Sequence, residues 1–336
     1  MRASSYGWCL ALLGGTVVLS VLVGAESISP VEIGKMLLAR LGGGAVTGSS
    51  DETILFGLRL PNTALIALIG ATLGGSGAAY QGLFRNPLAD PYIIGVAPGA
   101  ALGAVVAMTL LGPSRLLGIA AVPAAAFLGA LLTVFLACAV ARVGKTTPVT
   151  TLILAGVAMG AFTSSLTWFL ILQTHVDVER AIVFMLGGFR QLGWAPVLAA
   201  LPYSLLGLVV ILLLGRSINV LQFGDEQARQ MGLDVEKVKL TLILAATLAA
   251  ASAVAFAGII GFVGLVVPHV VRLLWGPDYR SLVPLSILAG AATLLAADTL
   301  SRGLPGFRGL QVGVITALIG VPFFLWLLRR EKSRYW

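Results

Sequence analysis

The chain contains 336 residues, of which 58% are hydrophobic and 11% charged, and its formal net charge is +8. An ordinary soluble domain carries about 25% charged residues, so a soluble fold of this size would lack the polar side chains needed to cover its surface. The composition therefore excludes a soluble enzyme, a nucleic-acid-binding protein and a disordered linker. It predicts an all-α, polytopic membrane protein.

Cysteine and histidine usage argues against disulfide and metal chemistry. The two cysteines, Cys9 and Cys138, both lie in apolar runs, and the two histidines, His175 and His269, are 94 positions apart. We therefore expect no disulfide framework and no bound metal. The sequence also lacks a Gly-x-x-x-x-Gly-Lys-Ser/Thr loop, so the chain is not expected to hydrolyse ATP by the P-loop route itself.

Nine charge-free stretches run through the sequence, most of them near the roughly 20 residues that a helix needs to cross the hydrocarbon core of a bilayer. In chain order they are residues 3–25, 60–84, 91–114, 116–141, 146–176, 191–215, 240–271, 281–297 and 309–328. The first resembles a signal peptide because Arg2 precedes it. It lacks a clean small-residue cleavage site and more membrane segments follow it, so we expect a retained first helix.

The stretch 240–271 contains Gly258 and Gly261, where the chain can turn back and form two spans instead of one. The positive-inside rule separates the two possibilities, because cytoplasmic loops collect Lys and Arg. Ten spans with both termini inside place 14 of the 22 basic residues on the inner side, whereas nine spans place only 10 there. We predict ten transmembrane helices in one domain, residues 1–336, with both termini in the cytoplasm.

Two connections are long enough to hold structure of their own. In the outer segment, residues 26–57, Ser29 is a candidate N-cap followed by Pro30, which predicts a short helix on the outer membrane surface. The inner segment, residues 216–239, is the most polar part of the chain. There the acids at 225–226 and the later Gly232 are start and stop signals for a helix of about two turns.

Two shorter inner connections also have distinctive sequences. The prolines that bound Pro87–Pro91 forbid a regular helix and leave Asn86 in a tight turn. With the apolar Leu88 between them, the segment is predicted to form a constriction held by protein, the alternative being a simple turn. In the other connection, Thr146 or Thr147 either caps the following helix or contributes to a pathway, and both interpretations stay open.

Asp298 is embedded in an otherwise charge-free span, which makes it a candidate proton or sodium site. Arg302 lies four residues later, on the same helix face. Because an unpaired buried charge costs several kcal/mol, we favour a structural ion pair between the two. His269 has no nucleophile or carboxylate close in sequence, so we expect a structural role for it rather than a catalytic one.

Taken together, these residues resemble the permease subunit of type II ABC importers for ferric siderophores, haem and vitamin B12. The resemblance covers roughly residues 55–328. It rests on Arg59–Pro61, Gln81, Arg85–Pro91, Gly95–Ala100, Gly187–Phe189, Glu226–Gly232, Gly261–His269, Ala297–Asp298, Arg302 and Gly320–Phe324.

The resemblance implies a multi-pass protein of a bacterial inner membrane that forms a homodimer around a central pathway. Its other implied partners are membrane lipid, two cytoplasmic ATPase subunits that bind ATP and Mg, and a periplasmic or lipid-anchored substrate-binding protein. No nucleic acid and no cofactor of its own are implied.

Individual residues match the functional positions of that family. Those that match the ATPase-coupling element are Glu226, Ala228, Arg229 and Gly232, and those that match the cytoplasmic gate are Asn86, Pro87, Leu88, Thr146 and Thr147. Arg59 and Arg302 match arginines that pair with glutamates of the binding protein. Asn62 stands where some members carry a further arginine, and Arg308 is the candidate for the missing charge.

Two other classes of function compete with an ATP-driven importer. A secondary transporter would use Asp298 and would depend on protons or sodium rather than on ATP. An intramembrane enzyme is less supported, because no nucleophile–base or paired-carboxylate set is present. The substrate does not follow from the sequence; ferric siderophore is the first expectation on family breadth, followed by haem and cobalamin.

Overall fold

The computed structural model describes residues 2–24, 26, 28–41, 49–110, 115–116, 119–144, 146–173, 177–188, 191–303 and 309–332. Within these ranges the regular structure is helical apart from one short antiparallel pair of strands, β1 (Arg115–Leu116) and β2 (Ile119–Ala120), and one isolated bridge. The predicted all-α class is therefore confirmed.

The helices follow one another with short connections. They are α1 (Arg2–Leu22), α2 (Pro30–Leu41), α3 (Ser50–Thr53), the π-helical η1 (Ile54–Arg59), α4 (Leu60–Phe84), the 3-10 helix η2 (Pro91–Ile94), α5 (Val96–Leu110), α6 (Ala121–Ala141), α7 (Val149–Gln173), α8 (Val178–Met185), α9 (Ala195–Leu213), α10 (Gly215–Leu221), α11 (Asp225–Gln230), α12 (Val235–Ala257), α13 (Val263–Trp275), α14 (Tyr279–Gly303) and α15 (Val312–Lys332).

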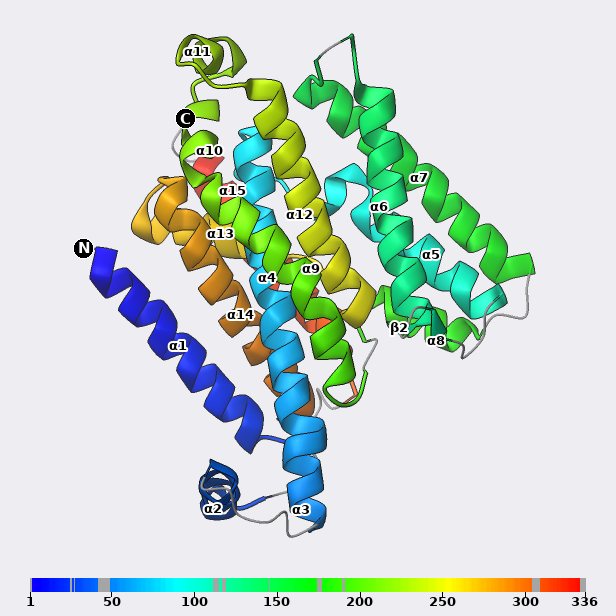
Figure 1. Ribbon diagram of the computed structural model, residues 1–336, viewed down its shortest axis with the longest axis vertical. Helices are drawn as coiled ribbons and strands as arrows, with labels where there is room; N and C mark the ends of the chain where they lie inside the picture. The colour runs from blue at the N-terminus through cyan, green and yellow to red at the C-terminus, as the bar shows by residue number, and fades with distance from the viewer. Residues whose placement is uncertain are drawn as a thin grey trace.

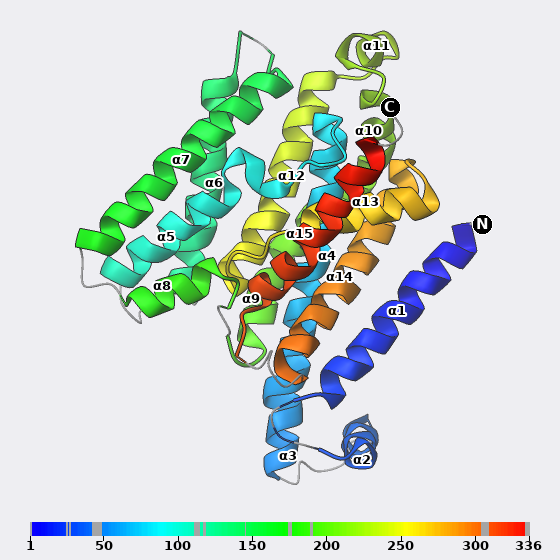
Figure 2. The same ribbon diagram turned by 180° about the vertical axis from the view of Figure 1, so that it is seen from behind.

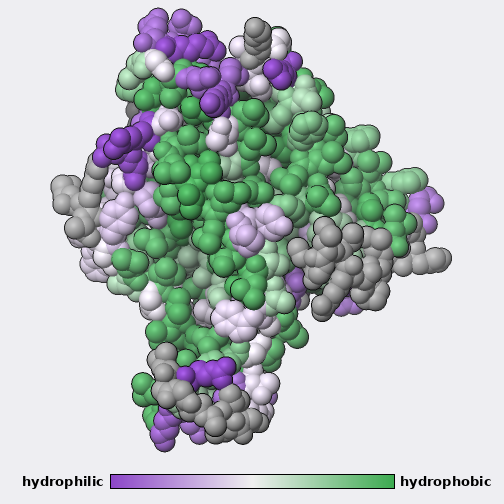
Figure 3. Space-filling model, viewed as in Figure 1, coloured by the Kyte–Doolittle hydropathy of each residue, from purple (hydrophilic) through white to green (hydrophobic). Residues whose placement is uncertain are grey.

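Seven helices of the described chain are long and apolar enough to cross a membrane: α1, the continuous helix over α3, η1 and α4, and α6, α7, α9, α12 and α14. The helices α5 and α13 and the part of α15 up to Trp326 are shorter and also apolar. Figure 3 shows hydrophobic side chains across the middle of one face, with hydrophilic ones over α11 at one end and near α2 and α3 at the other. The chain is therefore a multi-pass membrane protein.

Helix α4 runs through the middle of the bundle and packs against α9, α12, α13 and α14 (Figure 1). Helices α5 to α8 form a group on one side of it, and α1 stands on the other side, against α14. Figure 2 shows α15 crossing the face that is hidden in Figure 1. The polar helix α11 lies at one end of the molecule, whereas α2 and α3 lie at the opposite end.

Glycines allow the central helices to approach closely. A Cβ atom on Gly74 would lie 2.2 Å from the carbonyl oxygen of Ser286, and one on Gly70 would lie 2.4 Å from that of Gly290. Neither position can hold a larger residue without separating α4 from α14. The hydrophobic effect does not drive helices together inside a bilayer, so close backbone packing of this kind stabilises the bundle instead.

The predicted break after Ala257 is confirmed. Helix α12 ends there, and Gly258 adopts a φ of 80°, which a residue with a side chain rarely adopts. The chain stays non-helical until α13 begins at Val263, and Phe262 itself has a φ of 68°. One long apolar stretch therefore holds two separate helices.

Other boundaries differ from the sequence prediction. The helix expected to begin at Leu60 begins at Ser50, where the Ser49 side chain caps it. The last residues of the segment 26–57 are therefore helical and run into α4 without a break. Helices α8 and α10 were not predicted, because each is short and mixed in polarity. The predicted short helix in the outer segment is α2.

Candidate functional site

Helix α11 presents charged side chains to solvent while one apolar residue fixes it to the bundle. Ala228 is fully buried and packs with Leu221 and Val235. The side chains of Glu226 and Arg229, in contrast, are 79% and 44% exposed. This helix can therefore bind a partner protein through its charged side chains while Ala228 stays packed against the bundle.

The ends of α11 are fixed by backbone geometry. Gly224 precedes it with a φ of 101°, and Gly232 follows it with a φ of 84°. The N–H of Leu233 donates to the carbonyl of Ala228 at 3.0 Å, which closes the helix in a Schellman motif. The helix predicted from the acids and from Gly232 is confirmed.

The connection after α4 is a tight turn, as predicted for Asn86. Arg85 adopts a left-handed conformation with a φ of 50°, and the N–H of Asn86 reaches back to the carbonyl of Gln81 at 3.1 Å. The side-chain oxygen of Asn86 then accepts the N–H of Leu88 at 2.9 Å. These bonds hold Asn86, Pro87 and Leu88 in one fixed shape at the end of α4.

Asp90 completes this connection by accepting the N–H of Tyr92 at 2.8 Å, at the start of η2. Burial raises the pKa of the Asp90 carboxyl to about 6, and the hydrogen bond from Tyr92 opposes that rise. The segment from Arg85 to Ile94 is therefore an ordered turn rather than a loose loop.

Hydrogen bonds also fix the described residues between α6 and α7. Val143 and Thr146 pair as an isolated bridge, and the Thr146 hydroxyl donates to the carbonyl of Val143 at 3.1 Å, inside the turn, instead of capping α7. The backbone N–H of Thr147 donates to Glu236 at 2.9 Å. This second connection is thereby joined to the start of α12.

Ion pairs that the sequence did not predict connect these elements. Arg85 lies 3.6 Å from Asp225, and Arg229 lies 3.5 Å from Glu236. Lys239 contacts Asp225 as well. The one sign of these ion pairs in the sequence is the position of Lys239, directly before a long apolar stretch. A lysine that is buried there needs acidic partners.

At the opposite end, Arg59 and Arg302 both bind the carbonyl end of α1. Arg59 is 5% exposed and donates to the carbonyls of Val21, at 3.0 Å, and of Leu22 and Glu26. Arg302 donates to the carbonyl of Val23 at 2.8 Å. Two cations at a helix C-terminus complement its dipole, so both arginines stabilise the position of α1.

Asp298 is 1% exposed and forms the expected ion pair with Arg302, at 2.9 Å. The side-chain amide of Asn62 also donates to Asp298 at 3.1 Å. The residue at which the sequence departs from some family members is thus a partner of the intramembrane acid. These contacts agree with the structural role favoured for Asp298.

Three further sequence candidates add little to the site. Arg308 and His175 lie outside the described residues. His269 is 3% exposed and lies inside α13, and the described residues contain no group of three or more His, Cys, Asp or Glu that could hold a metal ion.

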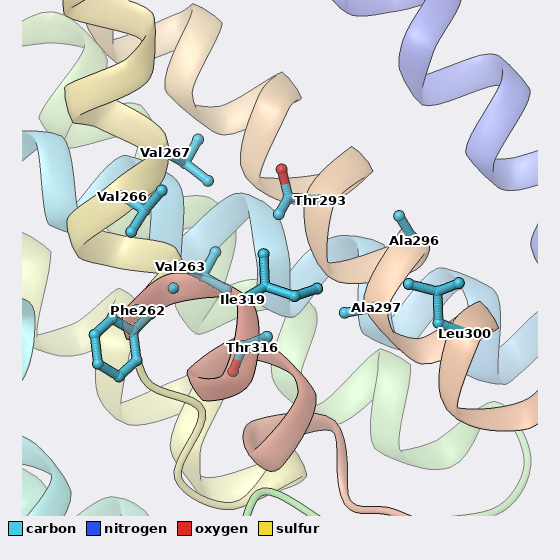
Figure 4. A pocket seen from close by; sticks show the side chains of 11 residues that line it. Phe262, Val263, Val266, Val267, Thr293, Ala296, Ala297, Leu300, Thr316 and Ile319 are labelled. Atoms are coloured by element: carbon cyan, nitrogen blue, oxygen red, sulfur yellow. The ribbon is translucent and has the colours of Figure 1, made fainter. Parts of the chain in front are cut away.

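A groove of about 150 Å³ lies between α13, α14 and α15 (Figure 4). Phe262, Val266 and Ile319 are among its walls. Its two hydroxyl groups, on Thr293 and Thr316, donate to backbone carbonyls of their own helices. The groove therefore offers an apolar surface and no charged group to hold a polar ligand.

Comparison with known proteins identifies the chain. The model of the FecCD transport family matches residues 11–330. The chain belongs to this family. It is 46% identical over 283 residues, 84% of this chain and 75% of the other, to the cobalamin import system permease protein BtuC of Halobacterium salinarum.

Other FecCD relatives carry different names. The hemin transport system permease protein HmuU of Yersinia pestis is 37% identical, with 84% of each chain covered, and the Fe(3+)-citrate import system permease protein YfmD of Bacillus subtilis is 36% identical, with 94% and 91% covered. A solved inward-facing conformation of a metal-chelate type ABC transporter superposes with a TM-score of 0.81 and 26% identity, over 98% and 99% of the two chains. This FecCD chain is a permease of the type II ABC importer class.

Proposed function

We propose that two copies of this chain form the pathway of an importer in a bacterial inner membrane, driven by two separate ATPase subunits and supplied by a substrate-binding protein. The observation that carries the proposal is α11, an exposed charged helix anchored through the buried Ala228, at the end of the bundle where both candidate gate connections lie (Figure 1). An ATPase subunit that binds α11 acts close to both connections.

The proposal includes ten spans and cytoplasmic termini in a single permease domain. Seven long and three shorter apolar helices in the described chain support that number. Helix α13 has only 13 residues, and the non-helical segment 258–262 adds the remaining length of its span. In this arrangement residues 216–239 face the cytoplasm and residues 26–57 face the periplasm.

The roles assigned to single residues follow from exposure. Glu226 and Arg229 contact the ATPase, Ala228 holds the helix and Gly232 ends it. Asn86, Pro87 and Leu88 close the pathway from one connection, and Thr146 and Thr147 close it from the other. The fixed hydrogen bonds of the first turn support this assignment, since a gate needs a defined shape.

We propose a bulky metal chelate as the substrate, of the kind that the relatives' names describe: cobalamin, hemin or ferric citrate. No ATP, Mg or other cofactor is assigned to this chain, because the nucleotide belongs to the ATPase subunit. Selection among the chelates is assigned to the binding protein, since weakly binding walls favour passage.

We assign contacts with the binding protein to Arg59, Arg302 and Arg308, on the family resemblance. Arg59 and Arg302 already direct their guanidinium groups at the carbonyl end of α1, and Arg302 also pairs with Asp298, so we expect their contributions to docking to be indirect. Replacing Arg308 by Glu should weaken docking most at low salt, and a matching Glu→Arg change on the partner should recover part of the affinity. Unchanged affinity across ionic strengths would remove Arg308 from the interface.

Two substitutions in α11 test the central proposal. Glu226→Arg reverses an exposed charge, and Gly232→Pro imposes a φ near −65° where the chain has 84°. Both variants should insert normally yet lose stimulation of ATP hydrolysis by the loaded binding protein in proteoliposomes. Uptake of labelled cyanocobalamin, hemin and ferric citrate should fall by tenfold or more for whichever chelate the unaltered transporter carries.

Glu179→Arg is the matched control. Glu179 is also an exposed glutamate in the first turn of a short helix, α8, which packs beside α5 and lies far from α11 (Figure 1). It should leave ATPase stimulation unchanged. Normal stimulation in both α11 variants would refute the coupling role.

A further inference from the structure

Lys239 is a buried cation near the start of α12. Its side chain is 4% exposed, and its ammonium contacts a carboxylate oxygen of Asp225 and lies 3.9 Å from one of Glu236. The first acid belongs to α11 and the second to α12. A lysine ammonium has three rotatable donors, so it can hold two carboxylates at once.

The first carboxylate extends this contact to one candidate gate. Asp225 also lies 3.6 Å from Arg85, the left-handed residue that ends α4 and directly precedes Asn86. A second contact runs in parallel, because the amide of Gln222 donates to the carbonyl of Gly82 at 2.9 Å. The segment around α11 therefore touches the end of α4 through two side chains.

The second carboxylate extends the contact to the other candidate gate. One oxygen of Glu236 accepts the backbone N–H of Thr147 at 2.9 Å, while the other lies 3.5 Å from Arg229 of α11. The α6–α7 connection is thus tied to α12 and α11 through one side chain.

We propose that Lys239 is a positioning residue that makes α11 and the two gate connections move together, with Asp225 and Arg85 as one arm and Glu236 and the N–H of Thr147 as the other. The inference rests on the proposed function, since it assumes that an ATPase moves α11. It adds a residue inside the protein, with no contact to substrate or nucleotide, that passes this motion to both gates.

The difference in burial between Lys239 and its neighbours explains why Lys239, rather than Arg85, holds the two arms together. Arg85 and Asp225 have side chains that are 38% and 32% exposed, so water competes for their ion pair and the pair can open. Lys239 is shielded from water and depends on these two carboxylates to compensate its charge, so losing Asp225 would leave it only the longer contact with Glu236. Its two acids therefore stay attached to it, and displacement of one shifts the other.

The test uses the full transporter, with both ATPase subunits, in lipid nanodiscs. Cys9 and Cys138 are replaced, and spin labels are placed at Leu88 or, in a second sample, at Thr146 of both copies. The distance between the two labels is measured without nucleotide and with ATP and vanadate, for Lys239→Met and for Lys237→Met. Lys237 is the matched control because it lies two residues away on the same helix and is exposed.

Lys239→Met should reduce the nucleotide-dependent change in distance at least twofold at both labels, while Lys237→Met should leave it unchanged. Arg85→Gln should reduce the change at Leu88 only, because it cuts one arm. Lys239→Arg, which keeps the charge, should retain most of the change.

A full response at both labels in Lys239→Met would overturn the inference. If that variant does not assemble, Arg85→Gln decides: an equal loss or an equal response at both labels overturns it. Failure of the proposed function looks different, because then the unaltered transporter would not bind the ATPase or would show no change with nucleotide.

Discussion

The two ends of the molecule use charged residues in opposite ways. At the end that carries α2 and α3, Arg59 and Arg302 are directed at backbone carbonyls at the end of α1, and Asp298 is almost completely buried between Arg302 and Asn62. At the end that carries α11, ion pairs join separate elements, and most of the side chains keep contact with water.

The contacts of Arg59 and Arg302 form a clamp on α1, whereas the ion pairs around α11 form a connection that can move. Charges bound to backbone carbonyls inside the protein cannot exchange partners, because they would leave those carbonyls unpaired. Partly exposed pairs are worth only about 0–1 kcal/mol and can be broken and remade. The end that carries α2 and α3 is thus suited to holding α1 in place, and the end that carries α11 to following a moving partner.

The largest effect is expected at Asp298. Asp298→Ala leaves Arg302 without its counter-ion in a buried site and should lower the free energy of unfolding by about 3–5 kcal/mol. Asp298→Asn keeps the shape and one acceptor and should cost less. Unfolding in mixed detergent micelles with increasing SDS measures both, and equal stability of Asp298→Ala and the unaltered chain would contradict the clamp.

Asp298→Asn also separates ATP-driven from ion-driven transport. The variant should keep ATP-dependent uptake in proteoliposomes at any proton or sodium gradient. Loss of uptake with normal folding would instead favour an ion-coupled role for this carboxylate.

Arg59→Met should have the next largest effect. It removes the charged donor from the last two carbonyls of α1 and from that of Glu26 beyond it, and should cost about 1.5–3 kcal/mol. Because the site is buried, the loss should be the same at low and high salt. A loss that disappears in about 1 M salt would place Arg59 among the exposed charges, since salt screens only those strongly.

Gly74→Ala tests the close packing of α4 against α14. The added Cβ would meet the carbonyl of Ser286, and overpacking should cost about 1–3 kcal/mol in the same SDS titration. Gly14→Ala in α1 is the control, because a Cβ there meets nothing within 4 Å. Equal stability of the two variants would show that α4 and α14 separate easily.

The smallest effect on stability is expected at Arg229. Its pairs with Glu226 and Glu236 are partly exposed, so Arg229→Gln should cost less than about 1 kcal/mol. ATPase stimulation should nevertheless fall severalfold, because the side chain faces the proposed partner. A large loss of stability in Arg229→Gln together with normal ATPase stimulation would contradict the view that the ion pairs around α11 serve coupling rather than stability.

Local features of the molecule could be predicted from the sequence. The break after Ala257, the short helix that ends at Gly232, the turn at Asn86 and the Asp298–Arg302 pair each depend on residues within a few positions of one another. Glycine, proline and the spacing of charges along a helix determine such features directly.

Contacts between distant residues could not be predicted from the sequence. Asn62 meets Asp298 across 236 positions, and Arg59 meets the carbonyls of α1 across nearly forty. A single sequence shows periodicity and local signals but not which helices become neighbours. Asp225 meets Lys239 across 14 positions and from a different helix, so this pair did not follow from spacing along one helix.

Helix α4 connects the two ends of the molecule. Near its start it is pinned where Asn62 meets Asp298, and it finishes at Arg85. The two residues are about 35 Å apart along the helix, so a tilt of about 5° about the pinned end swings Arg85 through roughly 3 Å. An arc of that size would separate Arg85 from Asp225, which lie 3.6 Å apart, so a slight tilt of α4 would be enough to break this ion pair.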